Sequence, residues 1–144
     1  PWEVTRVNNE GVIFFDAPLE SITPANRIPF TQEYGVSWYK TDEEKKNRKI
    51  NADGKGWLAY CANNLLLVKK FDDLTASQPA PNEAEIQIYV NSGKTFIELE
   101  SQGAYDELKP GESLSYIVRW YLVPVNSESI PSKKLLSKAR KLIR

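Results

Sequence analysis

Histidine and methionine are absent from this 144-residue chain, and Cys61 is its only cysteine. Without histidine, the chain itself cannot form a Ser-His-Asp triad, a Cys-His pair or a histidine-bearing zinc site. One cysteine excludes an intrachain disulfide, and we expect Cys61 to be a small apolar residue within an apolar strand. The chain also lacks a glycine-rich phosphate loop, a GxSxG motif and any metal-ligand spacing, so we expect no cofactor and no metal.

The sequence also lacks a charge excess and a long hydrophobic run. Its 19 basic residues equal its 19 acidic residues, so the chain as a whole has no net field that would attract nucleic acid or an anionic membrane. No apolar run approaches the roughly 20 residues of a membrane-spanning helix. We therefore expect no nucleic acid partner and no membrane span.

What the sequence does contain is a series of short segments with the period of β-strands, clearest in EIQIYVN at residues 85–91. We expect a mainly β fold, an antiparallel β-sandwich over residues 1–125, followed by a linker and a C-terminal amphipathic helix over residues 126–144. We expect the basic back of this helix to be solvated, and contact with nucleic acid or anionic lipid is the alternative. Because the chain starts at Pro1 and has no methionine, we expect it to be a portion of a longer protein.

Turn signals between apolar runs predict which strands pair. We predict hairpins for residues 2–15, 56–71 and 85–100, with Asn63-Asn64 as the tight turn of the second one. The block of mixed charge at residues 41–56 is interpreted as an exposed turn or a short helix.

Residues 94–123 contain the strand pair that we take as the centre of the fold. The first half alternates, with Ile97 and Leu99 on one side and Glu98 and Glu100 on the other. The second half, residues 114–123, has two largely apolar faces, which is typical of a strand that is covered on both sides. We expect the two halves to pair across the Pro-Gly turn between them.

Glu98 and Glu100 share the outward face of their strand with Phe96, roughly 7 Å apart at twice the rise per residue. Two neighbouring carboxylates repel each other, so the pKa of at least one should be raised unless a cation such as Arg119 lies opposite. A carboxylate with a raised pKa suits a general base. Carboxylates beside aromatic rings also hold sugars, through hydrogen bonds to hydroxyl groups and ring faces against C–H groups. The alternative is a solvated strand face with two surface glutamates.

Aromatic rings and one loop supply the other ligand candidates. We predict that Trp38, Trp57 and Tyr89 form a platform for a ligand. The proline-interrupted loop at residues 16–30 contributes Arg27 as a polar candidate, and a solvated loop without function is the alternative.

The segment Leu99-Glu100-Ser101-Gln102, followed by LKPGESLSYIVRWYL, resembles the C-terminal end of galactose-mutarotase-like proteins, the β-supersandwich superfamily. In that superfamily a Leu-Glu-x-Gln segment precedes a Leu-x-Pro-Gly-Glu turn and a last long strand with aromatic residues. The opening PWEVTRV and the segment GWLAYC resemble one bacterial domain-of-unknown-function family within it. The resemblance covers this C-terminal segment well and most of the remaining chain weakly.

The resemblance implies a supersandwich portion that interacts with carbohydrate, and it places Glu100 at the position of the catalytic base of aldose mutarotases. Gln102 belongs to the same motif, and we take it with Glu98 as a ligand-binding candidate. Mutarotases are longer and pair the base with a histidine acid, which this chain lacks, so a tyrosine or an arginine would have to supply the proton. A bacterial periplasmic or extracellular location is our expectation, although the single cysteine does not decide the compartment.

Two functions from different classes follow. The first is a carbohydrate-binding or carbohydrate-processing domain with its sugar site on the open sheet face, with aldose-1-epimerase-like chemistry at Glu100 as its strongest form. The second is a non-catalytic structural or accessory β domain that packs against a missing N-terminal portion or a homo-oligomer partner. A concave pocket with an aromatic wall at Glu100 would favour the first.

Overall fold

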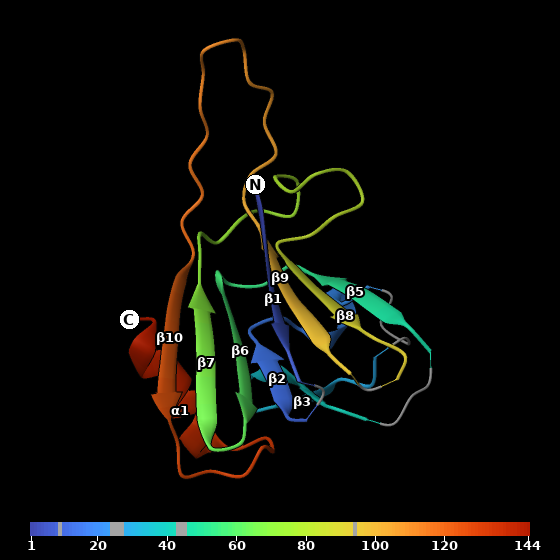
Figure 1. Cartoon of the computed structure of the whole chain (residues 1–144), viewed down its shortest axis with the longest axis vertical. Helices are drawn as coiled ribbons and strands as arrows, with labels where there is room; N and C mark the ends of the chain where they lie inside the picture. The colour runs from blue at the N-terminus through green and yellow to red at the C-terminus, as the bar shows by residue number, and fades with distance from the viewer. Residues whose placement is uncertain (9, 24–27, 43–45, 94) are drawn as a thin grey trace.

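The computed structural model describes residues 1–8, 10–23, 28–42, 46–93 and 95–144, which form two antiparallel β-sheets and one α-helix (Figure 1). The predicted β-sandwich with a C-terminal helix is confirmed. The elements are β1 (Trp2–Val7), β2 (Val12–Phe15), a 3-10 helix (Leu19–Ser21), β3 (Thr31–Glu33), β4 (Val36–Lys40), β5 (Arg48–Ala52), β6 (Trp57–Ala62), β7 (Leu65–Lys70), β8 (Ile86–Val90), β9 (Ile97–Gln102), β10 (Arg119–Pro124) and α1 (Lys133–Leu142).

The two sheets face each other across the first hydrophobic core. The four-stranded sheet has the order β1-β9-β8-β5, and the six-stranded sheet has the order β10-β7-β6-β2-β4-β3. Because side chains alternate along a strand, Ile97 and Leu99 of β9 enter this core from one sheet, and Ile13 and Phe15 of β2 enter it from the other.

The six-stranded sheet has a second apolar face, and α1 covers it. The Ser132 hydroxyl caps the helix by accepting a hydrogen bond from the Leu135 backbone N–H at 3.2 Å. Leu135, Leu136 and Ala139 then pack against the sheet, as the helical spacing predicts. Cys61 of β6 is buried in this second core, which confirms its expected role as a small apolar residue.

Two of the predicted hairpins are present. β6 and β7 are joined by Asn63 and Asn64, whose φ values of 50° and 59° are those of a type I′ turn. β8 and β9 pair with Ile86 opposite Ser101 and Val90 opposite Ile97. Their apolar side chains point into the first core, as the alternation predicts.

The predicted hairpin at residues 2–15 is wrong, because its two strands belong to different sheets. β1 pairs with β9, whereas β2 pairs with β4 and β6, so the intervening chain crosses from one layer of the sandwich to the other. The charged block also differs from the interpretation as an exposed turn or short helix. It contains β5, which pairs with β8 along its whole length.

The predicted pairing of the two halves of residues 94–123 is wrong as well. β9 pairs with β1 and β8, whereas β10 pairs with β7 at the end of the other sheet. The predicted core strand is largely exposed, with Trp120 at 53% and Leu122 at 64% of their accessible surface. The reason is its position: β10 is the last strand of its sheet, and only the α1 side of it is covered.

A buried lysine on β7, the strand next to β10, connects the two sheets. Lys69 of β7 is fully buried, donates a hydrogen bond to the Leu99 carbonyl oxygen of β9 at 2.8 Å and forms an ion pair with Glu3 of β1. Burial lowers the pKa of Lys69, and the contact with Glu3 acts in the opposite direction. The pair therefore fixes β1 against the six-stranded sheet.

A buried carboxylate lies at the start of β8, at the same end of the four-stranded sheet as Glu3. Glu85 accepts hydrogen bonds from the backbone N–H groups of Gly56 at 2.8 Å and Leu74 at 2.7 Å, so it ties two loops to the start of β8. Burial raises its pKa from 4.5 to about 7 despite these two donors.

We expect this carboxylate to make the stability of the fold depend on pH. The folded-state pKa lies above the unfolded value, so the folded chain binds more protons, and the free energy of unfolding should fall as pH rises from about 4.5 to about 7, by on the order of 3 kcal/mol. Urea unfolding at a series of pH values should show this slope in the natural chain and lose it in Glu85→Gln. The exposed Glu128→Gln variant should keep it, and an unchanged slope in Glu85→Gln would contradict the assignment.

Candidate functional site

The outer face of the four-stranded sheet carries the acidic residues on which the sequence argument depends. Glu98, Glu100 and Gln102 of β9 alternate with the inward-facing Ile97 and Leu99, as the pattern predicts. Residues directly opposite each other on neighbouring strands share a face, so cross-strand pairing adds the following side chains to it. They are Trp2, Val4 and Arg6 from β1, Gln87 and Tyr89 from β8, and Lys49 and Asn51 from β5.

Glu100 faces outward but has only 1% of its surface exposed. Its carboxylate accepts a hydrogen bond from the Trp2 indole Nε1 at 3.0 Å, and the Lys49 ammonium nitrogen lies 3.6 Å away. Burial raises the pKa of Glu100, the charge of Lys49 and the Trp2 hydrogen bond lower it, and nearby Glu98 raises it. The raised pKa that the sequence predicts for one of the two carboxylates is therefore found at Glu100, and burial is its main cause.

Next to Glu100 the face is hollowed into a groove of about 360 Å³, which we call the sheet groove. Its two aromatic side chains are well exposed, Trp2 at 60% and Tyr105 at 68%. The remaining lining residues are Pro1, Lys49, Ala80, Glu83, Gln87, Gln102 and Gly103. Glu100 contacts two of the lining residues, Trp2 and Lys49, and so lies directly beside the groove.

A chain of hydrogen bonds holds the polar side chains of the sheet groove. The Gln102 amide nitrogen donates to the Glu83 carboxylate at 2.7 Å and to the Gln87 amide oxygen at 3.2 Å. The Gln87 amide nitrogen donates to Glu83 and, at 2.8 Å, to the Asn51 oxygen. These contacts fix the orientation of both amides, so the groove presents preorganised polar groups beside its two rings.

Glu98 and Tyr89 lie on the same face but away from the sheet groove. Glu98 is paired with Arg6 at 2.7 Å, and the Arg6 guanidinium stacks 4.9 Å from the centroid of the Phe96 ring. Tyr89 contacts the same ring, with 6.2 Å between ring centroids. This cluster is occupied by its own internal contacts.

Trp38 and Trp57, predicted as a ligand platform, lie on the other side of the molecule. Both are buried in the second core beneath α1, and Trp38 stacks on Phe14 with 4.3 Å between ring centroids. The prediction went wrong because α1 covers this face of the six-stranded sheet, so Trp38 and Trp57 have no exposed ring face. The other predicted contact, Arg27, lies outside the described residues.

Sequence reasoning missed Trp2, Lys49, Glu83, Gln87 and Tyr105 as site residues. The alternation of β1 indicates the shared face of Trp2, but its position next to Glu100 depends on a strand pairing across 98 residues of sequence. Lys49 was missed because the charged block was interpreted as an exposed turn or a short helix, whereas it contains β5.

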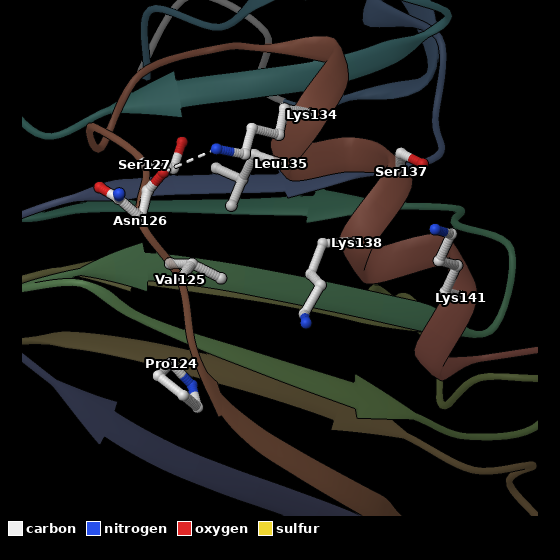
Figure 2. A pocket seen from close by; sticks show the side chains of 9 residues that line it. All are labelled: Pro124, Val125, Asn126, Ser127, Lys134, Leu135, Ser137, Lys138 and Lys141. Atoms are coloured by element: carbon white, nitrogen blue, oxygen red, sulfur yellow. Dashed lines mark hydrogen bonds between the residues drawn. The ribbon is translucent and has the colours of Figure 1, made fainter.

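A second, basic groove of about 340 Å³ lies between α1 and the segment that follows β10 (Figure 2). Lys134, Lys138 and Lys141 line it with the polar residues Asn126 and Ser127, and Lys134 donates to the Asn126 carbonyl oxygen at 3.0 Å. None of the described residues that line it is acidic. The groove lies on the α1 side of the six-stranded sheet, away from the sheet groove.

Within the described residues, no helix is long and apolar enough to cross a membrane. The same part of the chain contains no group of three or more histidine, cysteine, aspartate or glutamate side chains that could hold a metal ion. Comparison of the chain with family models, with curated proteins and with solved structures gave no match. The resemblance to galactose-mutarotase-like proteins accordingly stays a prediction.

The contact between Lys49 and Glu100 leads to a direct test of the site's electrostatics. Replacing Lys49 by Gln removes the nearest positive charge, so the already raised pKa of Glu100 should rise further. A carbon-13 NMR titration of the glutamate carboxyl groups would measure this change. The exposed Lys55→Gln variant serves as the control, and an unchanged or lower Glu100 pKa in Lys49→Gln would contradict the described contact.

Proposed function

We propose that this protein binds a carbohydrate in the sheet groove. The observation that carries the proposal is the combination of two exposed aromatic side chains, Trp2 and Tyr105, with the preorganised amides of Gln87 and Gln102 in one concavity. Aromatic faces pack against the C–H groups of a pyranose ring, and amide and carboxylate groups satisfy its hydroxyl groups. The volume of about 360 Å³ falls at the low end of ligand cavities, about 300–1,000 Å³.

Each polar residue has a distinct part in this proposal. The exposed Glu83 carboxylate and the Gln102 amide oxygen accept hydrogen bonds from sugar hydroxyls, and Lys49 adds a charged donor. The buried Gln87 holds the Gln102 amide in place. Glu100 acts as a positioning residue, because its carboxylate holds Trp2 through the indole nitrogen and Lys49 through its charge. Loss of the Glu100 charge would therefore disturb two walls of the groove at once.

An aldose-1-epimerase activity is the second candidate, favoured by the raised pKa of Glu100, which suits a general base. For this chemistry the Glu100 carboxylate has to reach the anomeric hydroxyl between Trp2 and Lys49. Lys49, 3.6 Å away, would take the place of the tyrosine or arginine expected as the acid. Because Glu100 is engaged by both neighbours, we expect no acceleration of the mutarotation of freshly dissolved glucose or galactose in polarimetry. Acceleration that is lost in Glu100→Gln would establish the catalytic role instead.

The binding proposal can be tested by following the four tryptophan indole groups by nitrogen-15 NMR while sugars are added. A panel of neutral mono- and oligosaccharides should shift the Trp2 signal selectively. The signals of Trp38 and Trp57, buried beneath α1, should stay in place and act as internal controls. If no sugar moves the Trp2 signal, or if all four signals move together, the sheet groove is not a specific sugar site.

Substitutions then identify the groups that make contact. Tyr105→Ala should weaken binding roughly two- to tenfold, as expected for the loss of a ring contact worth about 0.5–1.5 kcal/mol. Gln102→Ala should weaken it further, because the change also releases Glu83 and Gln87. Tyr34→Ala, an exposed ring outside the groove, is the matched control. Equal affinities in all four proteins would remove these side chains from the site.

An accessory role without sugar binding is favoured by a different observation. Six of the ten large hydrophobic side chains that are exposed in the described residues lie between Tyr105 and Leu122. Such a concentration of exposed apolar groups marks a surface for contact with another protein chain.

A further inference from the structure

The sandwich is open at one end because its two layers differ in width. β7 and β10 form the end of the six-stranded sheet, and α1 covers their outer side (Figure 1). On the inner side the four-stranded sheet does not extend over them, and three large side chains are exposed. They are Leu65 at 45%, Trp120 at 53% and Leu122 at 64%. This inner side is therefore an apolar shelf without a cover.

The shelf is bordered by a free strand edge. β1 pairs with β9 along one edge and, in the described part of the chain, with no strand along the other. Between this edge and the shelf lies a groove of about 300 Å³, which we call the lateral groove. It is lined by Arg6, Val7, Asn8, Tyr60, Ala62, Asn63, Leu65, Leu67 and Leu122. Free backbone groups beside an apolar floor are what an added extended segment requires.

The same chain contains a segment with exposed apolar side chains that could occupy the lateral groove. Residues 106–117, which we call the arm, connect β9 to β10. Tyr116, near the end of the arm, packs against the first core and Gly103, and the part around the turn projects beyond the ends of the strands (Figure 1). The arm turns at Lys109–Glu112, where Gly111 has φ 89° and the Glu112 N–H donates to the Lys109 carbonyl oxygen at 3.0 Å. Its apolar side chains Leu108, Leu114 and Ile117 are exposed.

We propose that two copies of this chain form a dimer by exchanging arms, each arm lying in the lateral groove of the other copy. The lengths agree, because six residues of extended chain, half of the arm, span about 20 Å, the same as the six residues of β1. The charges agree as well. The arm carries Asp106, Glu107 and Glu112 against one lysine. Among the described residues that line the lateral groove, Arg6 is the charged one, and its side chain, 69% exposed, stays open to a further carboxylate beside its partner Glu98.

A second copy fits better than any other occupant, because every copy supplies both the arm and the groove. In a reciprocal exchange about a twofold axis, both arms and both lateral grooves of the dimer are occupied. No arm or groove is then left to bind a third copy. Direct pairing of two β1 edges is disfavoured on steric grounds. Figure 1 shows β7 and β10 lying beyond β1 on this side, so such pairing would bring these strands of both copies to the same place.

Sedimentation equilibrium of the full chain over a concentration series tests the proposal. The natural chain should be dimeric, and Leu114→Asp in the arm and Leu122→Asp in the lateral groove should each weaken the dimer about 30-fold or more. Ile130→Asp, at an exposed apolar residue outside both features, should leave the dimer unchanged. Circular dichroism of each variant verifies that it is folded. A natural chain that is monomeric throughout, or a dimer that both variants preserve, would overturn the proposal.

A cross-link identifies the contact itself. In a Cys61→Ala background, a chain with Leu114→Cys is mixed with a chain with Leu122→Cys and oxidised. We expect a disulfide-linked heterodimer as the main product, whereas Ile130→Cys paired with Leu122→Cys should give none. An intrachain link in the double variant Leu114→Cys/Leu122→Cys would show the arm on its own groove and contradict exchange.

The arm exchange is independent of the sugar proposal, and one variant separates the two. Gln102→Ala changes the sheet groove but neither the arm nor the lateral groove, so it should keep the full dimer affinity. Loss of dimerisation in Gln102→Ala would count against the assignment of the contact to the arm and the lateral groove.

Discussion

The six-stranded sheet is apolar on both faces, and the architecture follows from the need to cover each of them. On one face, residues such as Ile13 and Phe15 require the four-stranded sheet. On the other, Phe14 and Trp38 require α1, so the helix is an integral part of the core. Four strands do not cover six, and the mismatch in width is concentrated at β7 and β10. Lys69 marks the boundary, because its ion pair with Glu3 holds β1 at the point where the cover ends.

The outer face of the four-stranded sheet is therefore not needed to cover either hydrophobic core. Its residues do not contribute to either core, and they bury polar contacts among themselves instead, such as those from Gln102 to Glu83 and Gln87. Glu100 shows how this works: a carboxylate on an outward face is buried by Trp2 and Lys49 from the neighbouring strands. Hydrogen bonds among its own side chains therefore fix the polar wall of the resulting groove.

Local signals predicted those parts of the fold that local interactions decide. The Asn63-Asn64 turn, the alternation of β8 and β9 and the apolar stripe of α1 are all fixed within a few residues of sequence. The pairing of β1 with β9 is not, since it depends on a core that assembles from distant segments. Residues 114–123 were misjudged for a related reason. An apolar pattern indicates that a surface needs a cover, and it does not say whether the chain itself supplies one.

The same distinction explains the candidate site. Alternation correctly placed Glu98, Glu100 and Gln102 on one outward face, whereas the choice of Trp38 and Trp57 failed because aromatic residues are equally common in cores. The side chains that complete the site, Trp2 and Lys49, come from strands whose neighbours only the tertiary structure reveals.

The lysine residues of the basic groove beside α1 show that charge is unevenly distributed over this neutral chain (Figure 2). Residues 133–144 contain six basic and no acidic side chains, so the remainder carries 13 basic against 19 acidic residues. A net charge of zero thus combines a basic α1 segment with an acidic remainder, so positive charge is concentrated on the α1 side. An anionic surface would turn the molecule before contact, with α1 toward the surface and the sheet groove facing away into solution.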